Sequence, residues 1–131
     1  MTAAGASDID EQGHVNNLVY LRWVQDAAAS HWRVLATLTE LAGIAWVVLR
    51  QEIDYLRAAL GGDRISLRTW VGTAPRMTFE RHTEIVRSRD GQVLAKARTL
   101  WCPIDSRTGR WRGIGPGLRE RVAIPAGEPA D

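Results

Sequence analysis

The feature that most constrains the fold is a helical segment with apolar residues on several of its faces. Between residues 17 and 41, apolar side chains recur at helical spacing, from Leu18 and Leu21 to Leu38 and Leu41. Further apolar residues stand beside this stripe, namely Val19, Trp23, Val34 and Ala36. A helix that is apolar on several faces is usually surrounded by other structure. The rest of the chain must therefore wrap around this helix.

The segments after the helix are typical of strands. We expect strands over 44–56, 65–71, 77–88, 92–104 and, more briefly, 110–114. The dipeptide Asp90-Gly91 predicts a tight hairpin between two of them. One long helix followed by antiparallel strands predicts an α+β domain in which a curved sheet wraps the helix.

The first expected strand carries apolar residues on both faces. Alternation places Val47, Leu49, Ile53 and Tyr55 on one face. The opposite face of the sheet then carries Trp46, Val48 and Trp70. A second apolar layer of this kind predicts that another subunit covers it, and hence a dimer.

Size and charge narrow the class of protein. A chain of 131 residues fits a single domain, which we expect to span 1–131 with an ordered core over about 7–122. The net charge of +2 and the scattered arginines do not call for a nucleic-acid partner. The single Cys102 excludes an internal disulfide and a cysteine-based metal cluster. Since no signal peptide or membrane-length apolar run is found, we expect a cytoplasmic protein without a membrane partner.

The loop before the helix, residues 7–20, has the composition of a reactive site. It contains Asp8, Asp10 and His14, with Gly13 as a natural hinge. The pair at 16–17, Asn-Asn, supplies an N-cap through one of its two side chains. Free amides and the helix dipole at this terminus favour developing negative charge, which a site that handles an oxyanion needs.

This loop resembles the hot-dog-fold thioesterases, in the branch of 4-hydroxybenzoyl-CoA thioesterase. The matching pattern is Asp10-x-x-Gly13-His14-Val15-Asn16-Asn17-x-x-Tyr20, and its His-Val-Asn-Asn element is also similar to that of plant acyl-carrier-protein thioesterases. The segments 52–56 and 62–63 are similar to the family's strand and turn after the central helix. The resemblance extends from residue 7 to about 114.

The resemblance implies a curved sheet around the central helix and hydrolysis of an acyl thioester. The carrier would be coenzyme A or an acyl carrier protein, with no metal or redox cofactor. The family also implies homodimers whose sheets join edge to edge, with active sites at the dimer interface. Pairing of dimers into tetramers is left open.

By the same resemblance, Asp10 is the catalytic carboxylate, and the amide that polarises the thioester carbonyl falls at or beside Asn17. Gln12 and His14 correspond to a loop residue and a histidine that assist the aspartate in the plant enzymes, although those enzymes have Asn where this chain has Gln12. Asp10 either attacks the thioester carbonyl directly or activates a water molecule. The alternative is that Asp10 only caps a turn, and that His14 is structural.

Four further residues are candidates for substrate binding. Tyr20 and Tyr55 are aromatic candidates, Tyr20 being equally suited to the core or a dimer interface. Arg76 and Arg81 are candidates for the phosphates of coenzyme A. A carboxylate on the central helix, as some hot-dog enzymes use, has no good match in Glu40 or Glu52.

A non-catalytic hot-dog module that binds acyl-CoA or acyl carrier protein is the alternative function. Family members carry an apolar strand before the Ser-Asp element, whereas only Met-Thr-Ala-Ala-Gly-Ala stands there in this sequence. A pathway thioesterase of the polyketide or enediyne kind ranks lower, because such enzymes tend to lack the loop aspartate. The sequence does not indicate the length or type of the acyl group.

Overall fold

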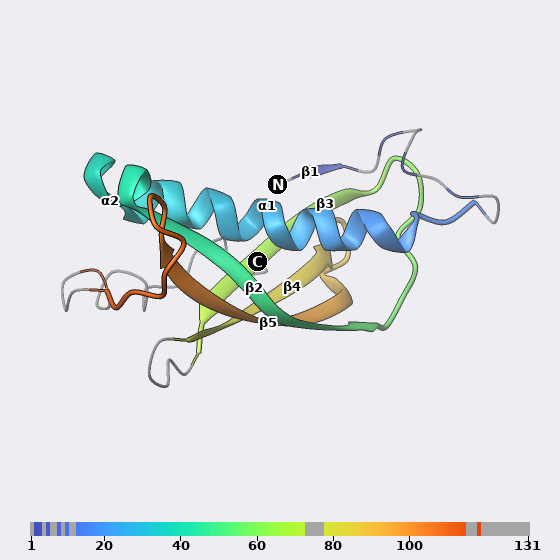
Figure 1. Cartoon of the computed structure of the whole chain (residues 1–131). Helices are drawn as coiled ribbons and strands as arrows, with labels where there is room; N and C mark the ends of the chain where they lie inside the picture. Colours follow the sequence, from blue (N-terminus) through green and yellow to red (C-terminus); the bar gives the residue numbers. More distant parts are fainter. Residues whose placement is uncertain are drawn as a thin grey trace.

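A single antiparallel sheet curves around one long helix in the computed structural model (Figure 1). The structure describes residues 2, 3, 5, 8, 10, 13–72, 78–114 and 118. The elements in chain order are β1 (Thr2–Ala3), α1 (Asn17–Leu35), α2 (Leu38–Gly43), β2 (Ile44–Tyr55), β3 (Arg64–Val71), β4 (Phe79–Arg87) and β5 (Gln92–Asp105). The strand order is β1-β3-β4-β5-β2. The expected α+β architecture is thus confirmed.

The central helix is shorter than its apolar pattern predicts. α1 ends at Leu35, and α2 starts after Thr37, whose side chain accepts a hydrogen bond from the Glu40 amide. The Glu40 carboxylate accepts in return from the Thr37 amide, which completes a capping box. The expectation of one helix to residue 41 is therefore wrong, because this local capping box outweighs the continuing apolar period.

Four of the expected strands are confirmed, and one is not. β2 and β5 form the longest ladder, from Ile44 opposite Asp105 to Tyr55 opposite Ala95. Between β4 and β5, Gly91 adopts a φ of 69°, which suits the tight turn that its sequence predicts. Within the described part of 110–114, only a single bridge forms, between Trp111 and Ile104. The fifth strand was therefore predicted wrongly.

The placement of Trp46 on the outer face of the sheet is also wrong. Its ring packs edge-to-face on Trp32 of α1, at 5.4 Å between centroids, so it points toward the helix. The register of β2 shifts between Val48 and Arg50, where a bulge interrupts the simple alternation. Trp70 does lie on the outer face, stacked on His82.

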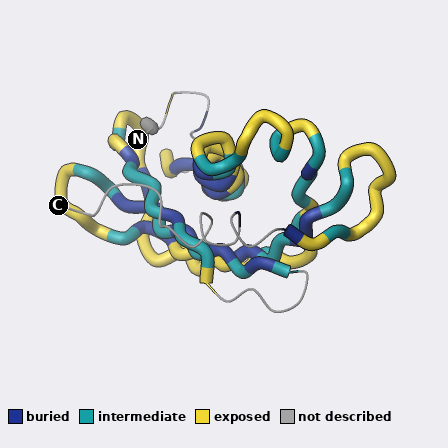
Figure 2. Tube along the Cα trace, turned by 90° about the vertical axis from the view of Figure 1, so that its left-hand side faces the viewer, coloured by how far each residue is buried: buried dark blue, intermediate teal, exposed yellow. Residues whose placement is uncertain are grey.

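The core lies between α1 and the concave face of the sheet. Figure 2 shows α1 end-on above the curved sheet, with the buried part of its surface turned toward the strands. The larger buried cluster gathers near the N-terminal half of α1 and includes Val19, Trp23, Ile65 and Leu94. A second cluster near the C-terminal half contains Ile44, Phe79, Ile114 and Leu118.

The first strand of the sheet is very short. β1 pairs with the edge of β3 through only two residue pairs, Thr2 with Ile65 and Ala3 with Arg64. Among the described residues, neither helix is long and apolar enough to cross a membrane.

Candidate active site

The loop before α1 is folded as a tight turn. The Asp10 amide donates to the His14 carbonyl at 2.8 Å, and the Gly13 amide donates to the Asp10 carbonyl at 3.1 Å. Gly13 has a φ of 78°, a left-handed conformation that glycine adopts without strain. The turn then joins the segment after β2, because the Val15 amide donates to the Ala59 carbonyl at 2.9 Å. The loop is therefore held by backbone hydrogen bonds on both of its sides.

The Asp10 carboxylate closes this turn as well. Its Oδ1 atom accepts a hydrogen bond from the His14 amide at 3.2 Å. The interpretation of Asp10 as a turn cap is thus confirmed. A carboxylate that accepts one hydrogen bond keeps further lone pairs, so this role does not compete with a chemical one.

The start of α1 settles which asparagine is the cap. The Asn16 side chain accepts from the Leu18 amide at 2.9 Å, and its carbonyl accepts from the Val19 amide at 2.9 Å. Asn17 is the first helical residue, and no described residue accepts a hydrogen bond from its amide. This amide lies at the positive end of the helix dipole, where a developing anion is stabilised.

Asp10 and the helix start share one pocket of about 210 Å³. The pocket is lined by residues of the loop, of α1 and of the end of β2, namely Asp10, His14, Val15, Asn17, Tyr20, Tyr55, Leu56, Arg57 and Ala58. Five of the residues predicted from the sequence therefore meet here. A carboxylate, an imidazole and a helix N-terminus around one small space are the groups that acyl transfer uses.

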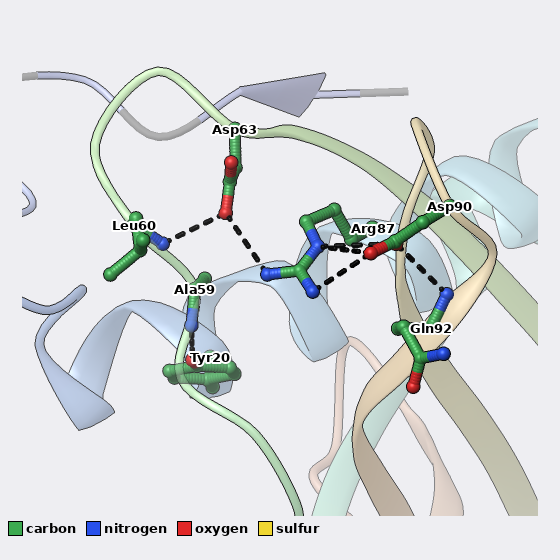
Figure 3. A network of polar contacts seen from close by, with 7 residues as sticks. All are labelled: Tyr20, Ala59, Leu60, Asp63, Arg87, Asp90 and Gln92. Carbon is green, nitrogen blue, oxygen red and sulfur yellow. Dashed lines mark hydrogen bonds and ion pairs between the residues drawn. The ribbon is translucent and has the colours of Figure 1, made fainter.

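A polar network begins at Tyr20, which lines this pocket (Figure 3). The Tyr20 hydroxyl accepts from the Ala59 amide at 2.8 Å, and the Asp63 carboxylate accepts from the Leu60 amide at 2.9 Å. Arg87 approaches Asp63 at 3.8 Å and donates to Asp90 at 2.9 Å. Because 59–60 pairs with 14–15, this network also fixes the loop that carries Asp10.

The two tyrosines of the pocket have different environments. Tyr20 is 3% exposed, and burial raises the pKa of its hydroxyl above the ordinary value. Its ring meets Tyr55 edge-to-face at 5.3 Å, and Tyr55 is half-exposed. Tyr20 is thus mainly a core residue that contributes one wall, whereas the accessible ring is that of Tyr55.

Asp8 has a role that the sequence did not indicate. It was expected to be a turn or surface carboxylate, but it is buried and accepts from the Gly5 amide at 2.9 Å and from Arg22 of α1 at 3.2 Å. The hydrogen bond from Gly5, followed by that from Arg22, lowers the pKa of Asp8 below its ordinary value. The sequence did contain one signal for this contact. Arg22 lies in the second turn of the helix that follows the loop of Asp8, within reach of that loop.

Of the two candidate phosphate-binding arginines, the one that the structure describes, Arg81, lies elsewhere. Arg81 lines a second pocket farther along α1 and does not line the Asp10 pocket. Arg57, which sequence reasoning missed, is exposed and lines the Asp10 pocket. Gln12 and Arg76 lie outside the described residues. Among the described residues, no three His, Cys, Asp or Glu side chains are grouped as a metal site.

Comparison with protein families decides the membership of the chain. A model of the thioesterase-like superfamily matches residues 4–127, nearly the full length. The chain belongs to the thioesterase-like superfamily.

An acyl-[acyl-carrier-protein] hydrolase of Cuphea viscosissima is 23% identical over 87% of this chain and 29% of its own length. A palmitoyl-acyl carrier protein thioesterase of Gossypium hirsutum is 25% identical over 76% of this chain and 26% of its own. The chain thus spans less than a third of these relatives.

Solved structures of superfamily members share the fold. A thioesterase of Thermus thermophilus, determined with coenzyme A and Zn, has a TM-score of 0.79 and 26% identity, covering 92% of this chain and 88% of that one. A 1,4-dihydroxy-2-naphthoyl-CoA thioesterase of Synechocystis has a TM-score of 0.79 and 20% identity, covering 92% and 91%. The expected hot-dog fold is therefore confirmed.

Proposed function

We propose that this chain hydrolyses acyl thioesters carried by coenzyme A or by an acyl carrier protein. The observation that carries the proposal is the convergence of the Asp10 carboxylate and the Asn17 amide on one pocket. Membership of the thioesterase-like superfamily supports it, and so do relatives that are named as thioesterases.

In this proposal the helix N-terminus binds the thioester oxygen. As the carbonyl carbon becomes tetrahedral, negative charge develops on the oxygen, and the Asn17 amide donates to it. The leaving group is a thiolate, which departs without a strong general acid. His14 lies at the same pocket and orients the thioester, while Gln12 stays a sequence-based candidate for assistance.

Asp10 acts in one of two ways that share the same geometry. In direct attack, its carboxylate forms a mixed anhydride with the acyl group, and water then hydrolyses the anhydride. In general-base catalysis, it takes a proton from the water that attacks. A single turnover in H₂¹⁸O separates them. Water activation labels the acid product, whereas direct attack with hydrolysis at the aspartyl carbonyl labels Asp10.

The test of the proposal is Asp10→Asn, assayed against a panel of acyl-CoA thioesters. We expect kcat to fall by about 100-fold or more, since a positioned carboxylate contributes at least this much. Asp26→Asn makes the same change at an exposed position of α1 and should leave turnover unaltered. Unchanged hydrolysis by Asp10→Asn would refute the assignment.

The carrier and the assembly complete the proposal. Arg57, at the Asp10 pocket, is placed to bind a phosphate of the carrier, which Arg76 and Arg81 were expected to do.

Two copies would join along β2, an edge strand of the sheet, because Val47 and Leu49 are exposed there. A cytoplasmic location stays a prediction from the sequence.

The alternative is a module that binds acyl-CoA or acyl carrier protein without hydrolysing it. The superfamily match and the shared fold describe a scaffold, and a scaffold of this kind can bind an acyl thioester without hydrolysing it. Saturable binding of an acyl-CoA with no thiol released over the whole panel would support this reading.

A further inference from the structure

A second pocket, separate from that of Asp10, lies between the C-terminal half of α1 and the sheet. It has a volume of about 210 Å³. One face of α1 and the inner face of the sheet line it, through Gln25, Ala28, Ala29, Trp32, Trp46, Val71, Phe79, Arg81 and Trp101. Its walls are thus aromatic and aliphatic, apart from Gln25 and one arginine.

That arginine is buried without an opposing charge. Arg81 is 8% exposed, and its Nη1 atom lies 2.9 Å from Nδ1 of His31 and 3.0 Å from Oγ1 of Thr69. Because a guanidinium only donates, Nδ1 of His31 must accept, so this nitrogen carries no proton. No carboxylate among the described residues pairs with Arg81.

Burial of the Arg81 guanidinium costs free energy, and the lowered pKa of this group reflects that cost. Desolvation lowers the pKa of Arg81 to about 10, which still leaves it charged at neutral pH. A buried charge is normally matched by a partner of opposite sign. Among the residues that the structure describes, its hydrogen-bond partners are two neutral acceptors, and both of them contact the same nitrogen.

The wall of the pocket has further donors without acceptors. The indole N–H groups of Trp46 and Trp101 are buried, and no hydrogen-bond partner is found for either among the described residues. The complementary ligand is therefore an acceptor. An anion with an apolar body matches both the guanidinium and the aromatic walls.

We propose that this pocket binds a small apolar carboxylic acid, with its carboxylate on Arg81 and its hydrocarbon body against the rings of Trp32, Trp46 and Phe79. An apolar cavity of about 150 Å³ accepts benzene, so this one has room for a single ring or a short branched chain. The site does not depend on the proposed hydrolysis, because no residue of the Asp10 pocket lines it.

Arg81 lies far from the start of the helix, because it contacts His31 in the C-terminal half of α1. From Asn17 to His31, α1 rises by about 21 Å at 1.5 Å per residue. The carboxylate is therefore either a free acid or the far end of a long acyl chain whose thioester lies near Asp10. Both sources present the same chemical group to Arg81.

Direct binding tests the site without turnover. Cyclohexanecarboxylate and its neutral counterpart cyclohexanecarboxamide are titrated by calorimetry at pH 7 into the whole chain. We expect the acid to bind about tenfold or more tightly than the amide, since hydrogen bonds to a charged group exceed neutral ones. Equal affinities, or no binding of the acid, would overturn the proposal, and neither result needs a variant to fold.

Two matched variants locate the effect. Arg81→Met keeps the volume and removes the charge, so it should abolish the preference for the acid. Arg98→Met makes the same change on the outer face of β5, where Arg98 pairs with Glu80, and should preserve it. A preference that persists in Arg81→Met would overturn the assignment to Arg81.

The source of the acid is separated by comparing hexadecanedioyl-CoA with palmitoyl-CoA. If the carboxylate belongs to the substrate, Arg81→Met lowers kcat/KM for the diacid thioester alone. If the carboxylate belongs to a free acid, Arg81→Met changes kcat/KM for the two thioesters equally or not at all. The same variant still loses the binding of cyclohexanecarboxylate. Either pattern supports the site, and failure of both substrates to turn over would concern the proposed hydrolysis only.

Discussion

At the scale of single residues, the turn before α1 contains two carboxylates with different tasks. Asp10 lines the pocket and caps the turn, whereas Asp8 is buried and binds the loop to Arg22 of α1. The family pattern singled out Asp10, which lines the pocket, for the catalytic role that we propose, but nothing in it indicated the anchoring role of Asp8. That role depends on a contact between residues fourteen positions apart.

Asp8→Asn should make the free energy of unfolding depend less on pH. The pKa of Asp8 is below its ordinary value of 3.8 in the folded chain, mainly because the Gly5 amide donates to it. Its carboxylate therefore stabilises the fold above about that pH, and the stabilisation is lost as the pH falls through the lower folded value. We expect the variant to lose about 1 kcal/mol of unfolding free energy at pH 7 and less than that at pH 3.

Urea unfolding at the two pH values measures this difference. Asp26→Asn, on the exposed side of α1, provides the control and should match the wild type at both. A deficit of Asp8→Asn that is equal at pH 7 and pH 3 would show that the charge is not involved.

Arg57→Gln tests where the carrier binds. If Arg57 holds a phosphate remote from the reacting carbonyl, its loss removes binding that is equal in the ground and transition states. KM for acyl-CoA should then rise about tenfold while kcat stays constant. Arg89→Gln, in the exposed β4–β5 turn, should change neither value, and a fall in kcat for Arg57→Gln would contradict the assignment.

At the scale of elements, the site depends on the contact between α1 and the segment after β2. The Tyr20 hydroxyl reaches across to the Ala59 amide, and the adjacent bridge between His14 and Leu60 carries this support to the loop of Asp10. α1 thus serves as the centre of the core and as the frame of the pocket.

Tyr20→Phe should destabilise the fold by about 1–3 kcal/mol, because it leaves the buried Ala59 amide without an acceptor. Chemical denaturation gives this value directly. Tyr55→Phe removes the same atom from a half-exposed ring, and we expect it to cost less than about 0.5 kcal/mol. Similar losses in both variants would mean that the Tyr20 hydroxyl contributes little.

At the scale of the whole molecule, the sheet has an edge that is suited to pairing. β2 is twelve residues long and, among the strands that the structure describes, has a neighbour on one side only, β5. Val47 is 40% exposed and Leu49 is 46% exposed along it. Because Tyr55 and the Asp10 pocket lie at the end of the same strand, a second copy paired there would border the proposed active site.

Sedimentation should therefore give twice the chain mass at micromolar concentration. Charges on an edge strand oppose pairing, so the double variant Val47→Lys with Leu49→Lys should sediment as a monomer. Val34→Lys places the same charge on an exposed position of α1 and should remain dimeric. A wild-type chain that sediments as a monomer would refute the edge-to-edge dimer.

The sequence by itself determined the helix, four of the strands and the loop residues that line the pocket. The helix and the strands follow from periodicity and turn chemistry, which act over a few neighbouring residues, whereas Asp10 was singled out from Asp8 by the resemblance of the loop to the hot-dog thioesterases. The predictions were wrong where a local hydrogen-bonding pattern competes with the apolar period, or where a bulge interrupts a strand. The capping box at Thr37 divided the helix, and the bulge after Val48 ended the simple alternation that had placed Trp46 outside.

Only the tertiary structure decided which distant residues meet. It placed Arg57 at the same pocket as Asp10, buried Asp8 against Arg22, and brought Arg81 to His31 in the C-terminal half of α1, away from the loop. Each of these depends on how strands from different parts of the chain pack around the helix. No local pattern encodes that packing, because the energy of a buried charge or hydrogen bond is set by neighbours that only the fold supplies.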